Sequence, residues 1–178
     1  MFVVLLTGPP GAGKSAVLTS LHDALGDEDV SGVALELDEL ERAYPPLPAD
    51  RALAHVAALS TSFREAGYGL LLLSATAETS AHLRALLDAT GAGEHLVVRL
   101  EALPAPLERR LTEREPVGWS GLPALIARSH RLASSMVTLE GVNLVLSTEA
   151  EPPEQVAARV EAALRDAPRR GPRVASTG

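Results

Sequence analysis

Eight residues near the N-terminus have the types and the spacing to bind a phosphate chain. The segment Gly8-Pro9-Pro10-Gly11-Ala12-Gly13-Lys14-Ser15 fits the pattern G-x-x-x-x-G-K-[ST]. Its glycines let backbone N–H groups curl around phosphate oxygens. Lys14, the only lysine in the chain, can reach the β- and γ-phosphates, and the Ser15 hydroxyl can bind Mg²⁺. We therefore expect a nucleoside triphosphate to be bound with Mg²⁺ by Gly8, Pro9, Pro10, Gly11, Ala12, Gly13, Lys14, Ser15 and Ala16.

Two carboxylates follow the second apolar segment of the chain. Residues 33–37 predict a strand, and Glu36 and Asp38 lie at its end, two residues apart, so they should point the same way. Asp38 is our expected general base, which accepts the proton of an attacking hydroxyl. Glu36 and Asp38, with Ser15, are the expected ligands of Mg²⁺. The alternative is a solvated acidic turn, because Glu39 and Glu41 are acidic too.

The third apolar segment offers no further metal ligand. Residues 70–73 are four leucines followed by Ser74-Ala75-Thr76, and the next carboxylate is Glu78. Many P-loop hydrolases carry a Walker B aspartate at the end of such a strand. Without one, Mg²⁺ must rely on Ser15 and the Glu36/Asp38 pair.

Arginines that could close over a phosphate come later in the chain. Arg110 and Arg114 are four residues apart and share one helix face. A guanidinium can bind phosphate oxygens in pairs during phosphoryl transfer, so both are expected to be catalytic, and Arg110 to contact the nucleotide as well. Ordinary surface ion pairs with nearby glutamates are the alternative. Arg109, Arg128 and Arg131 are weaker candidates, and Trp119 in the loop between the helices either caps the site or packs the loop down.

Short apolar segments alternate with helical patterns along the whole chain. Strands are expected at 2–6, 33–37, 70–73, 95–100 and 142–146, and helices at 14–25, 50–66, 80–90, 104–115, 122–136 and 152–166, with one helical turn at 40–44. Asp50 is the expected N-cap of the second long helix. This alternation predicts an α/β fold, a parallel sheet with helices on both faces. Ligands should bind at the carboxyl ends of the strands.

Length and composition favour one domain that binds a small molecule. The chain has 178 residues, a net charge of −7 and no cysteine. The acidic balance argues weakly against nucleic acid or an anionic membrane as the main partner, and no apolar run is long enough to cross a bilayer. We expect a cytoplasmic protein with a domain over residues 1–166, a lid around 104–135 and a disordered tail at 167–178. An exposed apolar helix face could support a homodimer.

The motifs GPPGAGKS, LELDELERAYPP and LERRLTERE together resemble the small P-loop kinases. These include shikimate kinase, gluconate kinase, the chloramphenicol phosphotransferase type and similar proteins labelled AAA-type ATPases. The resemblance covers roughly residues 1–166 and implies a five-stranded parallel sheet of order 2-3-1-4-5 with ATP·Mg²⁺ as donor. It implies that Asp38 binds or deprotonates the acceptor hydroxyl, and that Arg110 and Arg114 belong to the lid. The glycine-glycine loop of shikimate kinase is not reproduced by Ser74-Ala75-Thr76.

The leading hypothesis is therefore an ATP-dependent kinase that phosphorylates a hydroxyl of a small metabolite or antibiotic. Residues 44–48, His55, Phe63 and the segment after Leu73 are expected to line the acceptor pocket. The alternative is an ATP-binding or ATP-hydrolysing switch without a small-molecule acceptor. A GTPase is disfavoured because its N-K-x-D motif needs a second lysine. A nucleic-acid end kinase is less favoured because the chain is acidic.

Overall fold

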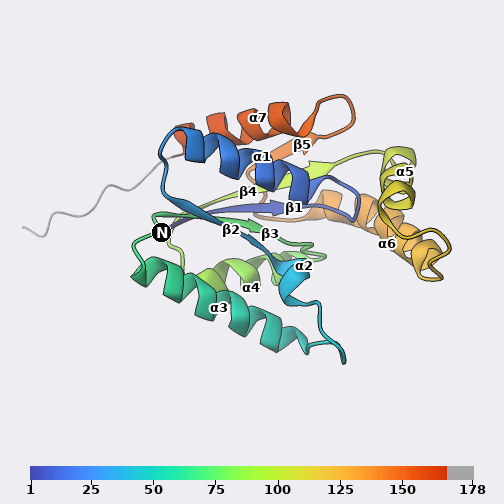
Figure 1. Cartoon of the computed structure of the whole chain (residues 1–178), viewed down its shortest axis with the longest axis horizontal. Coiled ribbons are helices and arrows are strands. Elements are labelled where there is room, and N and C mark those ends of the chain that lie inside the picture. The colour runs from blue at the N-terminus through green and yellow to red at the C-terminus, as the bar shows by residue number, and fades with distance from the viewer. Residues whose placement is uncertain (168–178) are drawn as a thin grey trace, which may run out of the picture.

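A five-stranded parallel sheet runs through the centre of the molecule, in the order β2-β3-β1-β4-β5 (Figure 1). The computed structural model describes residues 1–167. Its strands are β1 (Phe2–Thr7), β2 (Gly32–Glu36), β3 (Leu70–Ser74), β4 (His95–Glu101) and β5 (Leu144–Ser147). Its helices are α1 (Lys14–Asp27), α2 (Leu37–Leu40), α3 (Ala49–Glu65), α4 (Ser80–Thr90), α5 (Pro104–Arg114), α6 (Leu122–Ser135), the 3₁₀ turn η1 (Met136–Thr138) and α7 (Pro153–Asp166). The predicted α/β class and strand order are confirmed.

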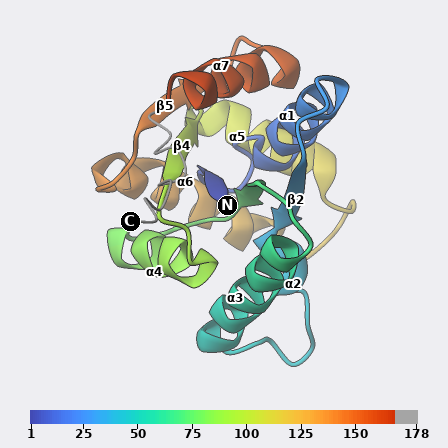
Figure 2. The ribbon, with the colours of Figure 1, turned by 90° about the vertical axis from the view of Figure 1, so that its left-hand side faces the viewer.

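Helices cover both faces of this sheet. Helices α1 and α7 pack on one face and on each other, while α3 and α4 pack together on the opposite face, where α6 also lies (Figures 1 and 2). The central strands β1 and β3 are apolar and buried on both sides, as is usual where helices cover both faces. Two apolar clusters result, one on each face. All strands point the same way, so their carboxyl ends meet at one edge, beside α2, α5 and α6.

The chain turns earlier after β2 than the sequence suggested. Strand β2 ends at Glu36, whose register partner is Ser74 at the end of β3, and the helical turn α2 begins at once instead of at residue 40. Leu37 is the buried residue of this turn and packs into the core cluster of α3 and α4. Asp38 consequently lies on a helical turn, and the expectation that it shares a strand face with Glu36 is wrong.

Two smaller expectations about helix ends also change. Asp50 was expected to cap α3, but the N-cap is Pro48, which has extended backbone angles (φ −59°, ψ 144°). Asp50 lies in the first turn instead, where its negative charge still favours the positive end of the helix. The tail expected at 167–178 lies outside the described residues from 168 onward. Among residues 1–167, none of the helices combines the length and apolar character needed to cross a bilayer.

Candidate functional site

The P-loop (residues 8–15) connects β1 to α1 and is packed so tightly that glycine is required. Gly8 and Gly11 have positive φ values of 156° and 82°. A Cβ atom on Gly8 would lie 2.5 Å from the carbonyl oxygen of Leu100, and one on Gly11 would lie 2.9 Å from that of Leu107. The end of β4 and the helix α5 therefore press against the loop and fix its path, as a loop that presents backbone N–H groups to phosphate needs.

Lys14 is buried at the first position of α1, with 7% of its surface exposed. Its Nζ donates to the carbonyl oxygens of Gly8 (3.1 Å) and Pro9 (3.4 Å). Burial lowers the pKa of Lys14 to about 8, and the negative charge of Asp38 partly offsets this effect. The loop thus holds a partly desolvated cation, whose attraction for an incoming phosphate is stronger than in water.

The Ser15 hydroxyl donates a hydrogen bond to Glu36 Oε2, between the start of α1 and the end of β2. Two hard oxygen ligands therefore converge beside the P-loop, which fits the preference of Mg²⁺ for oxygen. The described residues contain no cluster of three or more His, Asp or Glu side chains able to hold a metal. This is the usual situation for Mg²⁺, which keeps several waters and takes its other ligands from phosphates.

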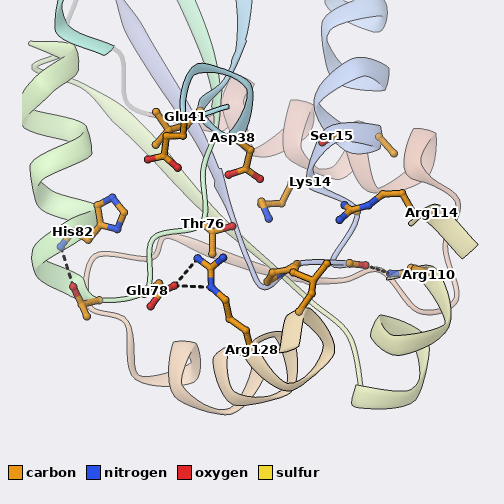
Figure 3. A pocket seen from close by; sticks show the side chains of 17 residues that line it. Lys14, Ser15, Asp38, Glu41, Thr76, Glu78, His82, Arg110, Arg114 and Arg128 are labelled. Atoms are coloured by element: carbon orange, nitrogen blue, oxygen red, sulfur yellow. Dashed lines mark hydrogen bonds and ion pairs between the residues drawn. The ribbon is translucent and has the colours of Figure 1, made fainter. Parts of the chain in front are cut away.

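A cavity of about 690 Å³ opens at the carboxyl ends of the strands, within the size range typical of small-molecule sites. Figure 3 shows the side chains of Lys14 and Asp38 pointing toward one another in it. Nine of the thirteen expected site residues line it directly, and Glu36 accepts the hydrogen bond of Ser15. The lining residues are Pro10, Gly11, Gly13, Lys14, Ser15, Ala16, Leu37, Asp38, Glu41, Thr76, Glu78, Thr79, His82, Arg110, Arg114, Leu125 and Arg128.

The acceptor side of this cavity differs from the sequence-based expectation. The segment after Leu73 lines it through Thr76, Glu78 and Thr79, as expected, but residues 44–48, His55 and Phe63 do not. Because the α2 turn ends at Leu40, the following chain leads away from the sheet, and Tyr44 is fully exposed. Phe63 instead packs edge to face against Tyr68.

The arginines around the cavity are engaged in different contacts. Arg110 donates from Nη1 to Gly11 O (3.2 Å) and Thr148 Oγ1 (2.9 Å), and from Nη2 to Thr148 O. Arg114 pairs with its neighbour Glu115. Arg128 donates from Nε and Nη2 to Glu78 Oε1 at 3.0 and 2.7 Å. Arg110 therefore ties α5 to the P-loop and to the loop after β5.

The loop between α5 and α6 carries Trp119, whose ring folds over Gly121. A Cβ on Gly121 would lie 2.3 Å from the Trp119 ring, and Trp119 does not line the cavity. Of the two roles considered for Trp119, this position fits packing against its own loop. Arg109 and Arg131 do not line the cavity either.

Sequence reasoning missed one residue that positions the P-loop. Ser129 on α6 is fully buried, and its Oγ donates to the carbonyl oxygen of Pro10 at 2.7 Å. Leu125 and Leu132 flank it at helical spacing, so a serine interrupts the inward face of an amphipathic helix. A polar residue at a core position needs a partner, and this signal could have identified it.

Comparison with solved structures finds the same fold in several kinases. No protein-family model and no curated protein sequence matches the chain. A sugar kinase from Janibacter sp. superposes with a TM-score of 0.66 at 18% identity, covering 93% of this chain and 95% of that one. The Mycobacterium tuberculosis APS kinase, solved with AMPPNP and APS, gives 0.65 at 20% identity, covering 92% and 96%. A gluconokinase from Sinorhizobium meliloti gives 0.60 at 21% identity, covering 92% and 95%.

These similarities establish the fold. The chain has the three-layer architecture of the small P-loop kinases, with the sheet order 2-3-1-4-5 and helices on both faces. The resemblance inferred from the sequence motifs is thereby confirmed at the level of the fold.

Proposed function

We propose that the protein is an ATP-dependent kinase that transfers the γ-phosphate to a hydroxyl group of a small molecule. The observation that carries this proposal is that Lys14 of the P-loop and Asp38 of the α2 turn line one cavity and point toward one another. A phosphate-binding cation and a carboxylate base in one cavity are the two groups that phosphoryl transfer to a hydroxyl requires. The fold shared with solved kinases supports the same reaction class.

The residues take distinct roles in this proposal. The P-loop backbone and Lys14 hold the phosphates of ATP, and Ser15, Glu36 and Asp38 would hold Mg²⁺, which neutralises phosphate charge when bound. Asp38 accepts the proton of the acceptor hydroxyl as its oxygen forms a bond to the γ-phosphorus. The bond from that phosphorus to the β–γ bridging oxygen breaks, and ADP leaves. Arg114 and Arg110 stabilise the negative charge of the transferred group.

Arg110 must exchange contacts to take that role. Its guanidinium is bonded to Gly11 O and to Thr148, so contact with phosphate requires it to give up at least one of these bonds. Arg114 needs no such exchange with the P-loop, because its partner Glu115 is its neighbour in sequence.

The test is a screen for ADP release from ATP and Mg²⁺ in the presence of sugars, amino alcohols, nucleosides and antibiotics. A kinase consumes ATP faster when its acceptor is present, and the phosphorylated acceptor is detected by mass spectrometry. If no acceptor stimulates ADP release although ATP binds, the kinase proposal fails. The alternative, a nucleotide-dependent switch, is then favoured.

A further inference from the structure

The wall of the cavity that faces the P-loop carries more negative than positive charge. Asp38, Glu41 and Glu78 line it, and Arg128 is its one arginine or lysine among the described residues. Arg128 is bound through two nitrogens to Glu78. The wall therefore has no unpaired cation within residues 1–167 that could receive an anionic acceptor.

Two of these carboxylates remain without a partner. Within the described part of the chain, neither Asp38 nor Glu41 forms an ion pair or a side-chain hydrogen bond, whereas the neighbouring Glu39 pairs with Arg42 at 2.7 Å. Asp38 and Glu41 are three residues apart on the α2 turn, a spacing that puts both on one side. Figure 3 shows them projecting together into the cavity, with Lys14 beyond Asp38 and His82 beyond Glu41.

The electrostatics of this pair favour a positively charged ligand. Partial burial raises the pKa of Glu41, and the negative charge of Asp38 raises it further, while His82 and Arg128 lower it. The two carboxylates thus repel each other. A cation between them would remove this repulsion, whereas an anion would increase it.

The α2 turn is well placed to act on the acceptor. Leu37 anchors the turn in the core, so the positions of Asp38 and Glu41 are set by the fold. Lys14 and Arg114 lie on the P-loop side of the cavity, where the phosphates of ATP would bring compensating negative charge. Since Mg²⁺ would offset the charge of Asp38 and Arg128 offsets that of Glu78, the charge of Glu41 remains for the acceptor.

We propose that the acceptor is an alcohol that also carries an ammonium group, such as an amino alcohol or amino sugar, and that Glu41 selects it. The inference rests on the proposed kinase function and names the substrate class of the same cavity. Asp38 takes the hydroxyl proton, and Glu41 binds the ammonium group. Glu41 acts as a specificity-determining residue and takes no part in the bond changes.

The test compares sugars of matched shape and different charge. Binding of 2-amino-2-deoxyglucose, glucose and glucuronate is measured by calorimetry without ATP, and ADP release is measured separately with the same sugars. We expect the amino sugar to bind about tenfold more tightly than glucose, a ratio reasonable for an ammonium group near two partly exposed carboxylates. Glucuronate should bind more weakly than glucose.

Variants on the same turn assign this preference to Glu41. Glu41→Gln should bring the ratio of amino sugar to glucose affinity close to one, and Glu41→Lys should reverse the order in favour of glucuronate. Glu39→Gln, which removes the same charge one turn position away and outside the cavity, should leave the ratio unchanged. Circular dichroism shows whether each variant is folded.

The two readouts separate this inference from the kinase proposal. If the amino sugar binds no better than glucose, or if Glu41→Gln retains the preference, the inference is overturned. Preferential binding without stimulated ADP release would sustain the charge selection and count against the kinase. Equal phosphate transfer to glucose and to the amino sugar would support the kinase proposal and overturn the charge selection.

Discussion

At the scale of single residues, Lys14 combines a cost in stability with a role in phosphate binding. Its pKa falls from an ordinary 10.5 to about 8 because the side chain is buried. Below pH 8 the ammonium group is charged in both the folded and the unfolded chain, and the folded state bears the full cost of desolvation. Between pH 8 and 10.5 the folded chain releases the proton first, so this cost disappears as the pH rises.

Replacing Lys14 with methionine should therefore stabilise the empty protein at pH 7. We expect the free energy of unfolding to rise by up to about 3 kcal/mol relative to the wild type. The difference should shrink as the pH rises from 8 to 10, because only the wild type regains stability there. Urea denaturation at several pH values measures this difference in the free energy of unfolding. A difference that stays constant with pH would show that the buried charge of Lys14 does not cause it.

Asp38 should matter far more for chemistry than for binding ATP, because the P-loop, Lys14, Ser15 and Glu36 still hold the nucleotide and Mg²⁺ without its charge. Asp38→Asn removes the proton acceptor and keeps the size of the side chain, so kcat should fall by about 10²–10⁴-fold with the Kd for ATP nearly unchanged. Steady-state kinetics with an identified acceptor measure the loss, and Glu39→Gln serves as the control on the same turn. Activity close to that of the wild type would make Asp38 merely a solvated acid.

At the scale of elements, the site depends on how α5 and α6 hold the P-loop. Arg110 on α5 bonds to Gly11 O, and Ser129 on α6 bonds to Pro10 O. Both contacts satisfy carbonyl oxygens of the loop and so hold its backbone in one conformation. Two helices far along the sequence thus fix the conformation of a loop near its beginning.

Removing the Arg110 side chain should loosen this arrangement. Arg110→Ala leaves the carbonyls of Gly11 and Thr148 without a charged donor, which should lower the free energy of unfolding by about 2–3 kcal/mol and raise the KM for ATP. The matched control is Arg109→Ala, because Arg109 is exposed and its side chain forms no hydrogen bond or ion pair within residues 1–167. This substitution should change the free energy of unfolding by less than about 0.5 kcal/mol. Equal effects of the two substitutions on urea denaturation would rule out this bracing role.

At the scale of the whole molecule, the parallel sheet places every site segment at one edge. The P-loop, α2 and the segment after β3 all follow carboxyl ends of strands, and α5 and α6 close the cavity from the side (Figure 1). Binding at such a place couples elements from the first half and the second half of the chain. A ligand held there should therefore stabilise the whole fold.

ATP with Mg²⁺ should raise the resistance of the entire domain to unfolding. At a free concentration of 100 times its Kd, the expected gain is about 2.7 kcal/mol, visible as a shift of the thermal midpoint. Lys14→Met should show little or no shift, because its phosphate cradle lacks the cation. A wild-type midpoint that does not move with ATP concentration would count against nucleotide binding in this cavity.

Several expectations about the whole molecule stay predictions. The extent of the kinase-like domain, the lid around residues 104–135, the homodimer and the cytoplasmic location all rest on sequence reasoning. Analytical ultracentrifugation at several protein concentrations would measure the oligomeric state.

The sequence by itself determined the fold class and the segments that carry the site. Alternation of short apolar segments with helical patterns is a local property, so it identified all five strands and their parallel arrangement. The P-loop motif is equally local, because its glycines and Lys14 lie within eight consecutive residues. These features could be predicted since they depend on neighbours in sequence.

Only the tertiary structure decided which distant residues complete the cavity. The burial of Leu37 turns the chain after β2 and directs Asp38 and Glu41 into the site, while residues 44–48 leave it. Likewise, Glu78 and Arg128 meet across 50 residues of sequence, and Ser129 reaches Pro10 across 119. Such contacts arise from the packing of helices on the sheet, and no local pattern specifies which polar side chains that packing brings together.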